Sequence, residues 1–172
     1  MNTLAIAAIA VALWSGSGAI RAHAQCFELP QLLGISTARM SVTQPERIPL
    51  LPASEWKLQK AALPTQEILW TSLLTSPLGV ANAQVMLRPL PGQLNPDVLL
   101  KTNQASCIKQ IRSSLKDLGL KPVPVTCPSC EAQRYQTSEF VATLYSGLKG
   151  DFPFLLVIHP TTTAPAPPSV SR

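Results

Sequence analysis

The residues of this sequence best suited to chemistry are its four cysteines, Cys26, Cys107, Cys127 and Cys130. An even number of cysteines predicts two disulfides if the chain is exported, and three connectivities are possible. Spacing favours Cys127 with Cys130 and Cys26 with Cys107. In the chain-entropy model, a bridge spanning about 80 residues contributes about 4–5 kcal/mol, and one closing four residues only about 2 kcal/mol. Cys26–Cys107 is therefore expected to be the stabilising cross-link, and Cys127–Cys130 invites another explanation.

The close pair Cys127 and Cys130 has the spacing of a redox-active disulfide. Residues 123–126 before it are a candidate strand, and a helix is expected somewhere within residues 131–148. The dipole of a helix stabilises a cysteine at its N-terminus as a thiolate. The first cysteine of such a pair attacks and the second resolves the mixed disulfide, so Cys127 would be the nucleophile and Cys130 the resolving thiol.

The segment Thr126-Cys127-Pro128-Ser129-Cys130 resembles the redox motif of the thioredoxin superfamily. The expected order of strand, helix, strand, CxxC, helix and strand over residues 83–158 is similar to the first part of that fold. The resemblance implies that Cys127 and Cys130 take the roles of the two motif cysteines in a thiol–disulfide oxidoreductase.

Two features of the flanking sequence favour a static loop for the same pair. Pro122 and Pro124 lack N–H groups on the same side of the candidate strand, so this strand can pair fully along one edge only. Residues 131–136 are mostly polar, and Thr137 or Ser138 can cap a helix that begins after them. In that arrangement the CPSC lies in a loop, away from any helix dipole.

Metal, acid–base and phosphate chemistry have little support in this sequence. A zinc site would need Cys26 and Cys107, or His159, to join the close pair, whereas a strong zinc signature has two close pairs. His159 follows an apolar run and precedes Pro160, which is typical of a strand-end residue without a catalytic task. Acidic residues show no paired spacing for acid–base work, and there is no glycine-rich phosphate loop. We expect neither a metal nor a cofactor.

Residues 1–24 are predicted to be a signal peptide. Leu4 to Trp14 is an unbroken apolar run, shorter than the roughly 20 residues of a membrane-spanning helix. Ala22 and Ala24 supply the small residues of a cleavage site that leaves Gln25 as the new N-terminus. The alternative is an uncleaved N-terminal anchor. No later apolar run is long enough to span a membrane, so the mature protein is expected to be exported, either periplasmic or secreted.

The charge of the chain is mildly basic and argues against a nucleic-acid partner. The formal net charge is +5, and aromatic residues make up 5% of the sequence. A nucleic-acid surface would combine a basic face with stacking aromatic residues. Lys109, Arg112 and Lys116 form a basic stripe along a predicted helix, interpreted as a solvated face. Trp56 and Trp70 are interpreted as core anchors.

The hydrophobic pattern predicts a small single α/β domain with a mainly parallel sheet of three or more strands. Residues 25–82 are broken by prolines and are expected to be irregular, with short helices at 54–62 and 65–74. Residues 83–159 form the predicted α/β core, and residues 160–172 a disordered proline-rich tail. The core is expected to contain strands at 83–88, 123–126 and 154–158, with helices over 96–118 and within 131–148.

These observations predict an exported, small, disulfide-containing domain with a binding, accessory or structural role in the cell envelope or extracellular space. Its partner is expected to be a protein. The alternative is a thiol–disulfide oxidoreductase or redox-responsive protein that uses Cys127 and Cys130. The alternative requires an exposed Cys127 at a helix N-terminus, whereas the binding role requires a bridge that stays oxidised.

Overall fold

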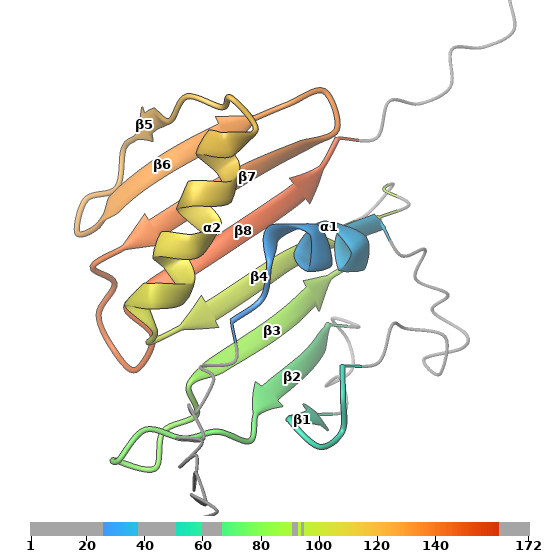
Figure 1. The fold of residues 1–172 in the computed structure, drawn as a ribbon, viewed down its shortest axis with the longest axis vertical. Helices are drawn as coiled ribbons and strands as arrows, with labels where there is room; N and C mark the ends of the chain where they lie inside the picture. Colours follow the sequence, from blue (N-terminus) through green and yellow to red (C-terminus); the bar gives the residue numbers. More distant parts are fainter. Residues whose placement is uncertain (1–25, 38–50, 60–66, 91–92, 94, 162–172) are drawn as a thin grey trace, which may run out of the picture.

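Eight antiparallel strands and two helices make up the computed structural model, which describes residues 26–37, 51–59, 67–90, 93 and 95–161 (Figure 1). The predicted signal peptide and residues 162–172 of the predicted proline-rich tail lie outside these ranges, whereas Pro160, predicted to begin that tail, ends the last strand instead. In chain order the elements are α1 (Leu29–Thr37), β1 (Trp56–Gln59), β2 (Ile68–Ser72), β3 (Ala83–Arg88), β4 (Asp97–Thr102), α2 (Ala105–Asp117), β5 (Val123–Val125), β6 (Glu131–Gln136), β7 (Phe140–Ser146) and β8 (Phe154–Pro160).

The strands form one sheet in the order β1-β2-β3-β4-β8-β7-β6-β5, and every neighbouring pair is antiparallel. This order is symmetric. Each half of the described chain supplies a helix followed by a four-stranded meander, and the last strands of the two halves, β4 and β8, pair in the middle (Figure 1). Helix α2 carries the chain from β4 to the far edge strand β5.

The prediction of an α/β domain with a mainly parallel sheet is therefore wrong. Segments predicted to be helical at 54–62, 65–74 and 131–148 contain strands instead, and the helix predicted over 96–118 begins only at Ala105. The segment 25–82, predicted to be irregular, supplies α1, β1 and β2. The physical reason is that strands with apolar residues on both faces also satisfy helical spacing over short stretches.

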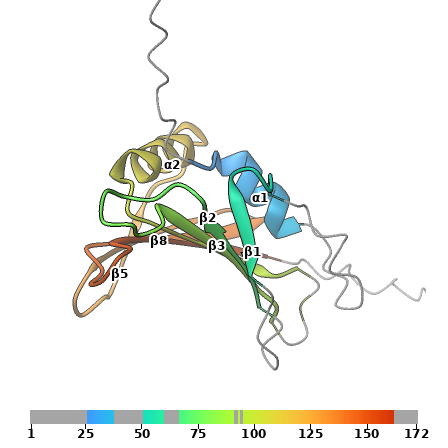
Figure 2. The same ribbon diagram turned by 90° about the horizontal axis from the view of Figure 1, so that it is seen from below.

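Both helices pack on the same side of the sheet, and the core lies between the two layers (Figure 2). Val85, Leu100 and Leu156 are paired across β3, β4 and β8 and are almost fully buried. Helix α2 places Ile108, Ile111 and Leu115 against this surface. Trp56 and Trp70 are buried in the same core, as the sequence predicts. Helix α1 packs on β8 and β4 and also touches α2.

The opposite side of the sheet carries no helix within the part of the chain that the structure describes (Figure 2). We call this side the open face, and two paired rows of residues define it. The first row is Leu69, Met86, Leu99, Val157, Thr143 and Arg134, and the second is Thr71, Gln84, Lys101, Leu155, Tyr145 and Ala132. The residues between these rows point to the helices.

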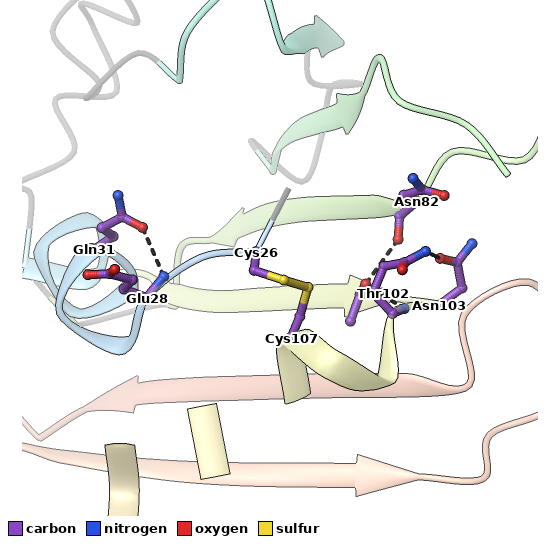
Figure 3. Close-up of a disulfide and its surroundings, with 8 residues drawn as sticks. Cys26, Glu28, Gln31, Asn82, Thr102, Asn103 and Cys107 are labelled. Atoms are coloured by element: carbon purple, nitrogen blue, oxygen red, sulfur yellow. Dashed lines mark hydrogen bonds between the residues drawn. A yellow bond between two sulfur atoms is a disulfide. The ribbon is translucent and has the colours of Figure 1, made fainter. Parts of the chain in front are cut away.

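The disulfide between Cys26 and Cys107 ties the start of the described chain to helix α2 (Figure 3). Their Cα atoms are 5.0 Å apart, and Cys107 is buried in the core at 1% exposure. Next to the bridge, Phe27 packs on Trp56 with ring centroids 5.0 Å apart. The bridge therefore joins residues that are distant in sequence at the edge of the core, which is the cross-linking role expected from the sequence.

Candidate functional site

The second disulfide, Cys127–Cys130, closes the turn between strands β5 and β6. Its Cα atoms are 5.3 Å apart, and both cysteines are partly exposed. Residues 131–136, which follow the pair directly, form β6 rather than the first turn of a helix. The helix dipole that would stabilise a thiolate at Cys127 is therefore not supplied by the segment that follows the pair.

Strand β5 lies at the edge of the sheet, as its prolines predict. It pairs only with β6 and has no neighbour on its other side in the described sheet. Pro124 sits opposite Gln133, and a proline has no N–H with which to pair along a second edge. Val123 beside it is 60% exposed. The Cys127–Cys130 bridge thus holds the connection of a short edge hairpin, a position in which a static disulfide has an evident use.

The open face has an apolar centre. Leu99 on β4 is only 5% exposed, although neither described helix covers it, and the neighbouring strands present Met86 and Val157 beside it in the same row. Met86 and Val157 themselves are partly exposed, as is Leu155 in the next row. Antiparallel sheets commonly leave one face to solvent, and that face then carries polar side chains in alternation. Here the middle of this face is apolar instead.

Charged groups surround this apolar centre. Glu67 pairs with Arg88 at 3.0 Å and Asp97 with His159 at 2.6 Å. Among the described residues these are the contacts between an acidic side chain and an arginine, lysine or histidine, so the remaining cations of the open face have no such partner there. The remaining cations are Lys57 on β1, Lys101 on β4 and Arg134 on β6. The carboxylates of Glu67 and Asp97 on this face are therefore already engaged, and positive charge is in surplus among the described residues.

His159 belongs to a cross-strand pair on the open face. Its Nδ1 atom lies 2.6 Å from Oδ1 of Asp97, and this contact joins β8 to β4 in the middle of the sheet. Asp97 is buried, whereas the imidazole of His159 is about one third exposed. Within the described ranges, no group of three or more histidine, cysteine, aspartate or glutamate residues is arranged to hold a metal ion. The geometry accounts for His159 as a strand-pairing residue.

A pocket opens at one end of the open face, beside the loop between β7 and β8. Its volume is about 320 Å³, and it is lined by Lys101, Leu148, Lys149, Asp151, Phe152 and Leu155. Sequence reasoning missed this pocket. The register of β4 with β8 and the fold of the β7–β8 loop bring Lys101 and Lys149 to the same pocket. Neither the register nor the loop fold can be predicted from the spacing of these residues in the sequence.

The sequence-predicted site residues do not converge on one place. The Cys127–Cys130 bridge lies in the edge hairpin, while Cys26–Cys107 lies at the helix layer.

No helix of the described residues is both long and apolar enough to cross a membrane. The chain matches no protein-family model, and no curated protein or solved structure is detectably similar to it.

Proposed function

We propose that this protein is an exported, disulfide-stabilised binding domain whose open face binds a protein partner. The observation that carries the proposal is the apolar, partly exposed centre of the open face, with Met86 and Val157 flanking the buried Leu99. Protein interfaces have this anatomy, with an apolar core inside a polar rim. The partner is one that presents acidic side chains around an apolar patch, since Lys57, Lys101 and Arg134 of this face have no ion-pair partner among the described residues.

The spacing of the cations fits a surface of interface size. Lys57 on β1 and Arg134 on β6 stand on opposite sides of the apolar centre, six strand spacings apart, or about 28 Å. An interface of ordinary size covers about 800 Å² on each partner, which a patch of this width can supply. Complementary charges at such a rim act chiefly on association rate and partner choice.

Two disulfides in a chain of this size support the export part of the proposal. Disulfides persist in oxidising compartments and are rare in the cytosol, so both bridges are compatible with a periplasmic or extracellular location. The predicted signal peptide points the same way. The proposal requires only that this compartment is oxidising.

The redox alternative has the partial exposure of Cys127 and Cys130 in its favour. Against it stands the hairpin setting, because strand β6 follows the pair where a helix N-terminus would be needed. Alkylation of the protein across a graded thiol redox buffer separates the two functions. A 127–130 bridge that stays closed under mild reductant supports the binding domain, and one that cycles readily supports the oxidoreductase.

Charge reversal tests the binding proposal directly. The probe is a short peptide with alternating glutamate and leucine residues, and a second peptide with lysine in place of glutamate is its counterpart. Titration followed by backbone amide chemical shifts is expected to place the acidic peptide on β3, β4 and β8. The variant K57E/R134E is expected to weaken its binding about tenfold, which corresponds to about 1.4 kcal/mol.

The matched control is K109E/K116E, which makes the same change in net charge on the exposed face of α2. It should leave the affinity of the acidic peptide within twofold. Equal losses in the two variants would mean that only net charge attracts the peptide. Equal binding of the lysine peptide would remove the charge argument, and amide shifts confined to the helix layer would place the interface elsewhere.

A further inference from the structure

We infer that the pocket beside the β7–β8 loop binds a small organic monocarboxylate with an apolar body. This inference does not rest on the protein-binding proposal, because it concerns a small molecule, although the pocket shares Lys101 and Leu155 with the open face. The pocket volume of about 320 Å³ lies at the lower end of the roughly 300–1,000 Å³ range of small-molecule sites. Such a volume suits a compact ligand.

The floor of the pocket is set by the pairing of two central strands. Lys101 on β4 and Leu155 on β8 are direct partners in the register, so an ammonium-bearing side chain and an apolar one lie side by side on the open face. Both are partly exposed. These two residues belong to the middle of the sheet, where the backbone is held from both sides, so the floor is preorganised.

The wall of the pocket is the loop between β7 and β8. The loop folds back on itself, because the N–H of Leu148 donates a hydrogen bond to the carbonyl of Pro153 at 3.1 Å. Gly147 and Gly150 have φ angles of 78° and 101°, which side chains other than glycine rarely adopt. The turn therefore depends on glycine, and it carries Lys149 and Phe152 to the pocket.

The lining combines two ammonium groups, one carboxylate and an apolar wall. None of Lys101, Lys149 and Asp151 belongs to an ion pair among the described residues, so Asp151 does not neutralise either lysine by direct contact. The lining has a net charge of +1, which a single carboxylate balances. Charge-assisted hydrogen bonds from ammonium groups are the strong interactions available to such a ligand.

The apolar wall determines the rest of the ligand. Leu148, Phe152 and Leu155 are partly exposed and offer apolar surface to a ligand. Burying alkyl groups of a ligand there is favourable because it removes apolar surface from water. A small fatty acid therefore has both features that the pocket offers, an anionic end and an apolar body.

Octanoate is the probe, with octanol, octylammonium and octyl phosphate as comparison ligands. Titration of the full mature chain, followed by amide chemical shifts, is expected to show octanoate at residues 101, 148–152 and 155. Its affinity should be at least tenfold higher than that of octanol, and octylammonium should not bind there. Tighter binding of octyl phosphate would overturn the monocarboxylate class, and equal binding of octanol would overturn the role of the lysines.

The variant K101M/K149M keeps the aliphatic part of each side chain and removes both charges. It should lower the affinity for octanoate at least tenfold, whereas K109M/K116M on α2 should leave it within twofold. F152A should lower it severalfold without abolishing the charge preference. An unchanged affinity in K101M/K149M, with the amide spectrum showing an intact fold, would overturn the site.

Discussion

The two disulfides should differ sharply in their contribution to stability, and paired alanine variants measure the difference. Cys26–Cys107 joins residues 81 positions apart, and Cys127–Cys130 joins residues three apart. In the chain-entropy model the first restricts the unfolded chain by about 4.5 kcal/mol and the second by about 1.6–1.9 kcal/mol. C26A/C107A should therefore lose about 2.5–3 kcal/mol more in free energy of unfolding than C127A/C130A.

Contacts in the native state act in the same direction. Cys107 is buried at 1% exposure, so its replacement by alanine also removes packed volume, whereas Cys127 and Cys130 are partly exposed. Phe27, the residue after Cys26, also packs on Trp56. For a protein of this size, each kcal/mol shifts the melting temperature by about 2–4 °C, so the two variants should melt about 5–12 °C apart.

Urea unfolding of the two variants, followed by circular dichroism, gives the comparison. The dependence of the free energy on urea should be steeper in C26A/C107A, because its unfolded chain exposes more surface without the long cross-link. The intact protein gives the free energy of unfolding with both disulfides, and a reduced and alkylated sample gives it with neither. Equal losses in the two variants, or a larger loss in C127A/C130A, would refute the assignment of Cys26–Cys107 as the main cross-link.

Two further predictions concern the sheet. L156A, at a fully buried position on β8, should lower the free energy of unfolding in urea by about 2–5 kcal/mol. L78A, at an 89% exposed position, should change it by no more than about 0.5 kcal/mol. Similar losses in the two variants would contradict the placement of the core. A double-mutant cycle with D97A and H159A should give a coupling free energy of about 0.5–1.5 kcal/mol because of the 2.6 Å contact, and no coupling would mean that this contact adds nothing to stability.

Features that depend on local chemistry could be predicted from the sequence. A proline lacks an N–H wherever it occurs, so Pro122 and Pro124 indicated a strand with one pairing edge, and β5 is an edge strand. Cysteine spacing favoured the two disulfides that the structure contains. Trp56 and Trp70 were expected in the core because aromatic residues are scarce in this chain, and both are buried.

Features that depend on distant pairing could not be predicted in the same way. In β7, Phe140, Ala142 and Leu144 face the helices, but Val141 on the other face is apolar too, so a helical spacing also fits this segment. Only pairing with β6 and β8 decides between the two. The resulting antiparallel register also places Lys101 next to Leu155 in the pocket beside the β7–β8 loop. No local stretch of the sequence indicates this pairing.

The sequence between β4 and α2 contains residues that disfavour a continuous helix, but the helical spacing of the apolar residues predicted one helix over 96–118. Thr102 Oγ1 donates a hydrogen bond to the carbonyl of Asn82 at 3.0 Å (Figure 3). The same oxygen accepts a hydrogen bond from the N–H of Gln104 at 3.0 Å. Threonine and asparagine side chains often compete with helix formation in this way. Thr102 and Asn103 marked a helix start after them, and the buried residues Val98, Leu99 and Leu100 before them form a strand.

The last strand of the described chain, β8, is also one of the two central strands, and this order constrains when the protein can fold. Until residues 154–160 leave the ribosome, β4 and β7 each lack a neighbour, and Leu156 and Ile158 are missing from the core. Contacts between segments so distant in sequence form slowly. The sheet therefore cannot close until β8 has been made, although the other seven strands precede it in the chain.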